Sequence, residues 1–312
     1  MRWRPDVLDG FEQATFDLEG DDDGPVVATL VRRTGGGRHR RAVLYVHGYN
    51  DYFFQSHLAQ RWESEGYDFY ALDLRRCGRS WRSWQLPHYV DDLRDYRPEL
   101  TVAAAWIRRT HDELVVNAHS TGGLTASLWA HSLRRKVAVD ALVLNSPWFD
   151  LASHWFDREV ATRLLDVVGP LDPHRVVADS PSRYAARLHV TAGGEWSYDP
   201  TLKSPDGVPV RAGWLRAVRR GHARLARGLR VRVPVLVCTC DRTGEGGDTV
   251  LDVAQIAARA DLVGPDVTLL TFADGEHDLA LSPEPARSQY FDAVFAWLRE
   301  RLPEPEGGEP RR

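Results

Sequence analysis

The sequence predicts an α/β protein whose mostly parallel sheet is covered by helices on both faces. Eight strand-like segments alternate with helix-like segments over most of the 312 residues, an order that gives parallel strands joined by crossover helices. Continuous apolar runs such as 42–46 are typical of strands that are buried on both faces. The chain is long enough for one large domain that carries an insertion.

The predicted strands are short runs rich in β-branched, aromatic and other apolar residues. A turn-rich segment of glycine, aspartate and proline at 20–25 separates the first two. In chain order the eight strands span 11–18, 26–31, 42–46, 67–74, 114–117, 141–145, 233–240 and 267–272.

Apolar side chains at helical spacing, together with end signals, predict the helices. For the last helix, Ser282 is expected to be the N-cap and Pro283 the first helical residue, and the helix is expected to run to residue 302. The other helices of the alternating part are one over 54–62 that Gly66 ends, and those at 90–109, 124–135 and 250–260.

The alternation stops between about residues 148 and 230, where no strand pattern is present. Apolar residues from 155 to 168 predict one helix, and 213–227 predicts a second. An insertion of this size after the sixth strand of a sheet is expected to form a helical lid. The predicted organisation is a core at 1–147, a lid at 148–230, the remaining core at 231–302 and a disordered tail at 303–312.

The composition is that of an ordinary globular protein. Hydrophobic residues make up 43% and the net charge is −4, so nothing favours nucleic acid as a partner. No apolar stretch reaches the roughly 18 residues of a membrane span, and no signal peptide is recognisable. Cys238 and Cys240, two of three cysteines, suit buried thiols better than metal ligands. We expect a cytoplasmic enzyme without cofactor or metal, of unknown oligomeric state.

The most informative motif lies at 115–123. A strand-like run stops at Ser120, small residues stand around the serine at Ala118 and Gly122, and a helix-like segment follows at once. A sharp turn between strand and helix is strained and needs small neighbours, and it presents its serine at the carboxyl edge of a sheet. Ser120 is therefore the expected nucleophile, with Ala118 a mild departure from the usual Gly-x-Ser-x-Gly.

A serine hydroxyl needs a base, and the base needs an acid that orients it. His277 lies in the loop after the last predicted strand, where the chain order of this architecture expects the base. Asp241 directly follows strand 233–240 and Asp248 precedes the next helix, so both compete for the role of acid. Asp241 would otherwise be a turn residue and Asp248 an N-cap, and spacing alone does not choose between them.

Two backbone N–H groups are expected to stabilise the negative charge that develops on the reacting carbonyl oxygen. One belongs to Thr121, which follows the nucleophile. The other is expected from Tyr49 in the loop after strand 42–46, where Gly48 allows the backbone to approach a ligand closely.

These motifs together resemble the α/β-hydrolase superfamily over about residues 40–302, outside most of the insertion. The similarity is greatest to the lysophospholipase, monoacylglycerol lipase and serine aminopeptidase branch, which has a His-Gly oxyanion loop and a lid. In that branch the acid is the first aspartate of a pattern like Asp-x-Val-x-Asp. The pattern is found here at 248–252, so the resemblance implies Asp248 rather than Asp241.

Two loops depart from the common form of that branch. The oxyanion loop continues with Tyr49 and Asn50 where Glu-His is frequent, and the base loop has its glycine one residue closer to His277. Neither departure changes the reaction class that the resemblance implies.

The expected reaction is hydrolysis of a small-molecule acyl ester, lipid-like or small, through an acyl-enzyme. Aromatic residues on or beside the expected carboxyl-edge loops suggest an apolar pocket, with lid-to-core packing as the alternative. Hydrolysis of amide, peptide, thioester or carbon–carbon bonds stays open, and a non-catalytic binding protein would require a defective triad. The expected pocket residues are Tyr52, Phe53, Phe54, Trp148 and Phe149.

Overall fold

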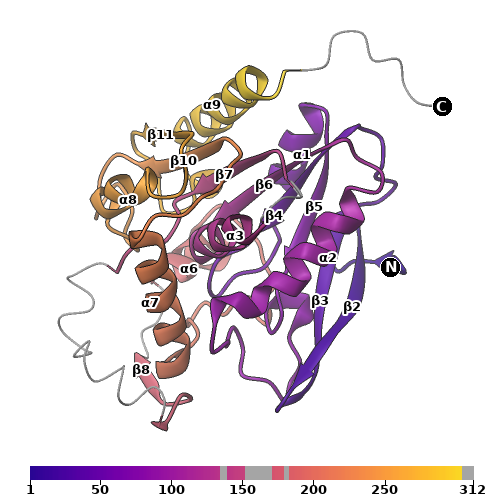
Figure 1. Cartoon of the computed structure of the whole chain (residues 1–312), viewed down its shortest axis with the longest axis vertical. Coiled ribbons are helices and arrows are strands. Elements are labelled where there is room, and N and C mark those ends of the chain that lie inside the picture. Colours follow the sequence, from indigo (N-terminus) through magenta and orange to yellow (C-terminus); the bar gives the residue numbers. More distant parts are fainter. Residues whose placement is uncertain (134–138, 152–170, 179–182, 304–312) are drawn as a thin grey trace.

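A nine-stranded sheet organises the part of the chain that the computed structural model describes, residues 1–133, 139–151, 171–178 and 183–303 (Figure 1). The strand order across this sheet is β1-β2-β3-β5-β4-β6-β7-β10-β11. The strands are β1 (Arg4–Pro5), β2 (Phe11–Asp21), β3 (Gly24–Arg33), β4 (Arg41–Val46), β5 (Tyr67–Asp73), β6 (Glu113–His119), β7 (Ala141–Asn145), β10 (Val235–Cys240) and β11 (Val267–Phe272).

The prediction of a mostly parallel sheet is confirmed. Six neighbouring strands, from β5 to β11 in the sheet order, run parallel, and β1, β2 and β3 add an antiparallel end. The sheet has one strand more than the eight expected. The additional strand is β1, whose two residues pair with β2 and are too few to give a sequence pattern.

Strand β4 lies between β5 and β6, so the chain leaves β4 toward one side and later returns on the other. At such a switch point the loops that follow the two neighbouring strands diverge and leave a crevice at the carboxyl ends of the strands. The loop after β4 begins at His47, and β6 ends directly before Ser120. The topology therefore places the two sequence motifs at the same edge of the sheet.

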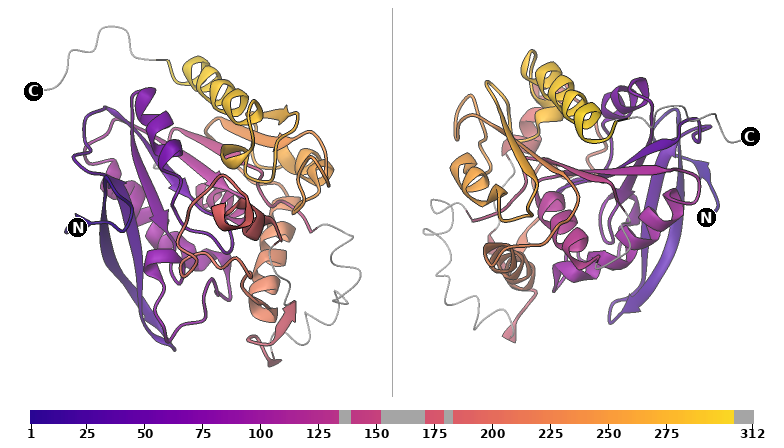
Figure 2. Two further views of the ribbon diagram at one scale, coloured as in Figure 1. Left: turned by 180° about the vertical axis from the view of Figure 1, so that it is seen from behind. Right: turned by 45° about the horizontal axis from the view of Figure 1, so that its top comes forward.

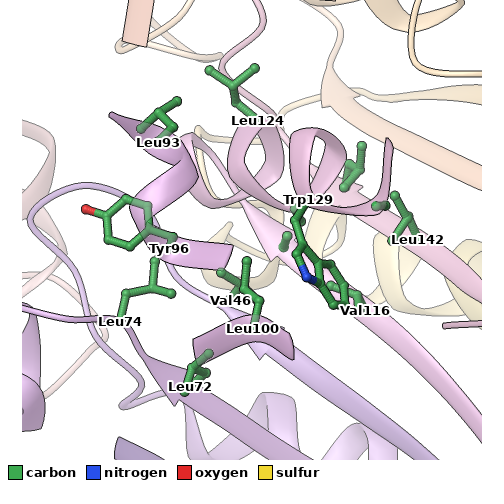
Figure 3. Close-up of a cluster of buried hydrophobic side chains, with 14 of the residues drawn as sticks. Val46, Leu72, Leu74, Leu93, Tyr96, Leu100, Val116, Leu124, Trp129 and Leu142 are labelled. Carbon is green, nitrogen blue, oxygen red and sulfur yellow. The ribbon is translucent and has the colours of Figure 1, made fainter. Parts of the chain in front are cut away.

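Helices cover both faces of the sheet, as Figure 2 shows in its right-hand view. Side chains of α1 (Ser56–Ser64) and α9 (Ala286–Arg301) fill the core on one face. Side chains of α2 (Arg97–Ile107), α3 (Thr121–Ser132) and α8 (Val253–Ala260) fill it on the other. Figure 3 shows Trp129 of α3 and Leu100 of α2 in this second core, where each is at most 1% exposed.

Several predicted helix starts were wrong. Helix α3 begins at Thr121 rather than at 124, and α8 begins at Val253 rather than at 250. The helix expected at 90–109 consists of a 3₁₀ turn, Leu93–Tyr96, followed by α2. The last helix begins at Ala286 rather than at Pro283, because Ser282 is used elsewhere. Its hydroxyl accepts from the Glu276 N–H at 2.8 Å and donates to the Asp278 carbonyl at 3.1 Å, so it tightens the loop before the helix and does not cap it.

The insertion joins β7 to β10 and contains short elements in its described residues. Strands β8 (Val176–Ala178) and β9 (Val210–Arg211) pair with each other, although no strand was expected here. They are accompanied by α6 (Arg183–Leu188) and α7 (Ala212–Ala226), and α7 matches the helix predicted at 213–227. The helix predicted over 155–168 lies outside the described residues, as does all but the first residue of the predicted tail.

Helix α7 packs directly on α3. A Cβ added at Gly221 would lie 2.9 Å from Leu93 and 3.2 Å from Leu124, so the absence of a side chain there lets the two helices approach. Because α3 starts next to Ser120, this contact places the insertion beside the crevice at the switch point.

Candidate active site

Ser120 stands in a strained turn between β6 and α3. Its φ of 54° and ψ of −121° lie in a region that residues with a side chain rarely adopt. The turn is crowded, since a Cβ at Gly122 would lie 2.3 Å from the His47 carbonyl oxygen and one at Gly123 would lie 2.7 Å from Pro147. The small residues in the motif are therefore required by packing, whereas Ala118 lies in the strand and its methyl group is accommodated in the core.

The loops after β10 and β11 bring an aspartate and a histidine to this serine. His277 Nε2 lies 3.0 Å from Ser120 Oγ, and His277 Nδ1 lies 2.9 Å from Asp248 Oδ2. The other carboxylate oxygen, Asp248 Oδ1, accepts the N–H groups of Val250 and Leu251 at 2.7 Å each. All three side chains are buried, at 7% exposure or less. The arrangement is a continuous hydrogen-bonded path from carboxylate to hydroxyl.

The structure distinguishes the two aspartates that the sequence left open. Asp241 is exposed and lies 3.8 Å from the guanidinium of Arg242. Asp248 is fully buried against His277 and is not the N-cap of α8, because Asp252 accepts the Ala254 N–H in that position. Burial alone would raise the pKa of Asp248, but His277 and the two backbone N–H groups hold it below its ordinary value.

The loop after β4 approaches the serine closely. A Cβ at Gly48 would lie 3.1 Å from Ser120 Cβ, so a side chain here would require Ser120 to shift by a few tenths of an ångström. His47 holds the start of the loop, since its Nε2 accepts the Leu74 N–H at 3.1 Å. Tyr49 and Thr121 both line the cavity in front of Ser120, and Thr121 is the first residue of α3, where helical N–H groups carry partial positive charge.

A cavity of about 770 Å³ opens in front of Ser120 and His277. Its walls come from the core loops and from the insertion, and most of them are apolar. The apolar and aromatic lining residues include Tyr49, Trp148, Ala178, Tyr184, Ala185, Val208, Val210, Trp214, Val250 and Leu251.

Of the five predicted pocket residues, Trp148 lines this cavity and the other four do not. Phe53 packs against Tyr45 and Phe69 in the core under the sheet, and Phe149 is fully buried in the opposite core. The remaining two pack with residues of the insertion in a separate cluster. The prediction was therefore wrong for Tyr52, Phe53, Phe54 and Phe149, which are covered by packing.

Sequence reasoning missed a polar group in the same cavity, formed by Asp51, His119 and Lys203. Lys203 Nζ lies 2.7 Å from Asp51 Oδ1, and His119 Nδ1 lies 3.8 Å from Asp51 Oδ2. Burial alone would lower the pKa of His119, but Asp278 and Asp51 raise it above the ordinary value. Asp51 and His119 lie close to the two motifs and were within reach of sequence reasoning, whereas Lys203 is in the irregular insertion.

The described residues meet neither the requirements of a metal site nor those of a membrane-spanning helix. They contain no group of three or more histidine, cysteine, aspartate and glutamate side chains that is placed to hold a metal ion. Among the helices in this part of the chain, none combines the length and the apolar character needed to cross a bilayer.

The parallel sheet, the serine between β6 and α3 and the following loops define an α/β hydrolase. Residues 37–284 match the model of the family described as serine aminopeptidase, S33. Because this match covers most of the chain, the protein belongs to that family.

Individual relatives agree with this placement. A monoacylglycerol lipase of Mycolicibacterium smegmatis is 28% identical over 271 residues, which cover 84% of this chain and 89% of the relative. A soluble variant of monoglyceride lipase from Saccharomyces cerevisiae, solved with a substrate analog, has a TM-score of 0.65 at 16% identity. The match covers 93% of this chain and 96% of the yeast chain. A thermostable carboxyl esterase from Bacillus coagulans, solved with glycerol, has a TM-score of 0.66 at 12% identity. This match covers 93% of this chain and 98% of the esterase. At these identities the two solved structures show the fold.

Proposed function

We propose that the protein hydrolyses carboxylic esters with Ser120 as nucleophile, His277 as general base and Asp248 as the acid that orients the imidazole. The observation that carries the proposal is the pair of distances on His277, 3.0 Å to Ser120 Oγ and 2.9 Å to Asp248 Oδ2. These are hydrogen-bond distances between the three group types that acyl transfer requires.

The proposed reaction has two halves. His277 Nε2 takes the hydroxyl proton as Ser120 Oγ attacks the carbonyl carbon, and the Tyr49 and Thr121 N–H groups stabilise the resulting oxyanion. The imidazolium gives its proton to the leaving alcohol, and an acyl-enzyme remains. Water then loses a proton to His277 and attacks the acyl carbon, which releases the carboxylic acid and restores Ser120.

The cavity favours an ester with an apolar acyl group. Its walls are largely aromatic and aliphatic and come in part from the insertion, for which we propose the role of a lid over the site. A relative named monoacylglycerol lipase supports a lipid-like ester as the substrate class. Esters of medium or long acyl chains are therefore expected to be better substrates than acetyl esters.

Amide or peptide hydrolysis is the second candidate function. The observation that favours it is the matched family, whose description names serine aminopeptidases. The same nucleophile, base and oxyanion-stabilising groups would serve an amide, since the two reactions differ mainly in the leaving group.

The test uses p-nitrophenyl esters from acetyl to palmitoyl beside aminoacyl p-nitroanilides, together with a serine-directed phosphonate probe. The wild type is expected to hydrolyse the esters and to react with the probe, and Ser120→Ala is expected to do neither. Ser132→Ala, near the end of the same helix, is the matched control and should behave as the wild type. Full labelling of Ser120→Ala would exclude this nucleophile, and activity on anilides alone would favour the second candidate.

A further inference from the structure

The loop after β4 is bound to the insertion through four successive residues, 49–52. Their partners all lie within residues 199–209, which we call the strap. The bonds are Tyr49 Oη to the Pro209 carbonyl (3.1 Å), Asn50 Nδ2 to the Ser204 carbonyl (2.8 Å), the Ser204 N–H to Asn50 Oδ1 (3.1 Å), Lys203 Nζ to Asp51 Oδ1 (2.7 Å) and the Asp199 N–H to Tyr52 Oη (2.8 Å).

The ion pair of Lys203 with Asp51 is the buried centre of this contact. The two residues are 5% and 2% exposed. The ammonium group also lies over the rings of Phe54 and Tyr198, with 5.1 Å and 5.6 Å to the ring centroids. Burial alone would raise the pKa of Asp51, but the charge of Lys203 lowers it below the ordinary value, so the carboxylate is held in its charged form.

The residue type at position 203 is unusual for this chain. Lys203 is one of two lysines among 40 lysine and arginine residues. An ammonium is a compact charge, whereas the planar guanidinium of arginine needs more room and directs its donors in one plane. A site bounded by a carboxylate and two aromatic rings suits the smaller group, so the lysine at this position has a steric reason.

The core makes hydrogen bonds to the two ends of the loop, and in the middle it places His88 beside Tyr49 and His119 beside Asp51. His47 accepts the Leu74 N–H, and the Phe53 N–H donates to Asp73 Oδ1 at 3.0 Å. Between these points Asn50 has a φ of 51°, in the left-handed region that asparagine adopts more readily than most residues with a side chain. The strap holds this residue, because the Asn50 amide makes two hydrogen bonds to the Ser204 backbone.

We infer that Lys203 is a positioning residue for ester hydrolysis, which acts by holding Asp51 and thereby the loop that contains the Tyr49 N–H. This inference rests on the function proposed above. The insertion then does more than cover the substrate, since its strap keeps one oxyanion-stabilising group in place. Loss of the ion pair should affect the transition state more than the binding of the ester in its ground state.

The test compares Lys203→Met, Lys203→Arg, Asp51→Asn and the double variant Asp51→Asn/Lys203→Met on one p-nitrophenyl ester. The kcat is calculated per active site, counted by titration with the phosphonate. Lys203→Met is expected to lower kcat about tenfold or more while KM changes less than about twofold, because a displaced oxyanion donor costs transition-state stabilisation. The double variant should lose no more than either single one, since both act through the same contact.

Arg32→Met serves as the matched control. It removes an ion pair with Glu12, 2.7 Å long, in the antiparallel part of the sheet. This variant should lower the thermal midpoint and leave kcat per site unchanged. Partial recovery of kcat in Lys203→Arg would support the charge as the cause.

The outcomes separate the two proposals. A wild type that is inactive on every ester overturns the proposed function and with it this inference. An active wild type with full kcat per site in Lys203→Met, accompanied only by a lower thermal midpoint, overturns the positioning role and leaves the proposed function intact. If Lys203→Met does not fold, the double variant, which leaves no unpaired charge, decides in the same way: full kcat per site overturns the positioning role, and reduced kcat supports it.

Discussion

Replacing Asp248 by asparagine tests the proposed orientation of the base with little change of shape. The asparagine Oδ1 can still accept the N–H groups of Val250 and Leu251, which anchor the side chain at 2.7 Å. Its amide NH₂ would then face His277 Nδ1, where the wild type has a carboxylate oxygen at 2.9 Å. An NH₂ group can only donate, so the imidazole must carry its proton on Nε2 and can no longer accept the proton of Ser120.

The expected magnitude follows from this change of tautomer. The kcat should fall by about 10⁴-fold, the loss typical of a triad whose histidine holds the wrong tautomer. The fold should lose only the charge-assisted bond to His277, on the order of 2 kcal/mol. A large loss of kcat with a small shift of the thermal midpoint would therefore indicate that Asp248 acts by orienting the imidazole of His277.

The assay is steady-state hydrolysis of a p-nitrophenyl ester by Asp248→Asn and by Asp241→Asn. Asp241 is exposed and is the aspartate that the sequence could not exclude, so its variant is the matched control and should keep wild-type kcat. If Asp241→Asn lost activity and Asp248→Asn retained it, the assignment of the acid and the reasoning from the distances would both be refuted.

Two further predictions concern packing and pH. Gly122→Ala should abolish ester hydrolysis and lower the free energy of unfolding by about 2 kcal/mol or more, because the new methyl group would meet the His47 carbonyl oxygen at 2.3 Å; an unchanged denaturation midpoint would contradict this. The pKa of Asp51 is lower in the folded protein than its ordinary value, so its contribution to stability is present above about pH 4 and is lost as the pH falls through the folded pKa. When the pH is lowered from about 6 to 3, the thermal midpoint should therefore fall less steeply in Asp51→Asn than in the wild type. Equal dependence of the midpoint on pH in the two proteins would contradict a lowered pKa of Asp51.

The sequence predicted those parts of the fold that a local pattern determines. Buried strands give continuous apolar runs, so the parallel strands and the position of Ser120 after β6 were recognisable. Chain order then indicates the loop after the last strand as the place of the base, and His277 in that loop lies 3.0 Å from Ser120 Oγ. These residues share the property that their place in the fold depends on the strand directly before them.

Other features of the fold and of the site depend on contacts between distant segments, and no local sequence pattern predicts such contacts. Residues 52–54 are consecutive aromatic residues in an irregular loop, where no period tells which side chain faces the cavity and which faces the core. Ser282 followed by proline has the form of a helix cap, but a hydrogen bond from Glu276 uses its hydroxyl. The place of Lys203 opposite Asp51 requires two segments 152 residues apart, and the irregular sequence around it gives no indication of that contact.

The topology nevertheless gives one reason for both the predicted and the missed residues. The loops after β4, β6, β10 and β11 meet at the carboxyl edge because these strands run parallel, and they bring Tyr49, Ser120, Asp248 and His277 together. The insertion leaves the sheet at the same edge, after β7, which is the neighbour of both β6 and β10. A long segment that starts there lies within reach of the loop after β4. The start of the insertion therefore allows the contact of the strap with residues 49–52, in which Lys203 pairs with Asp51.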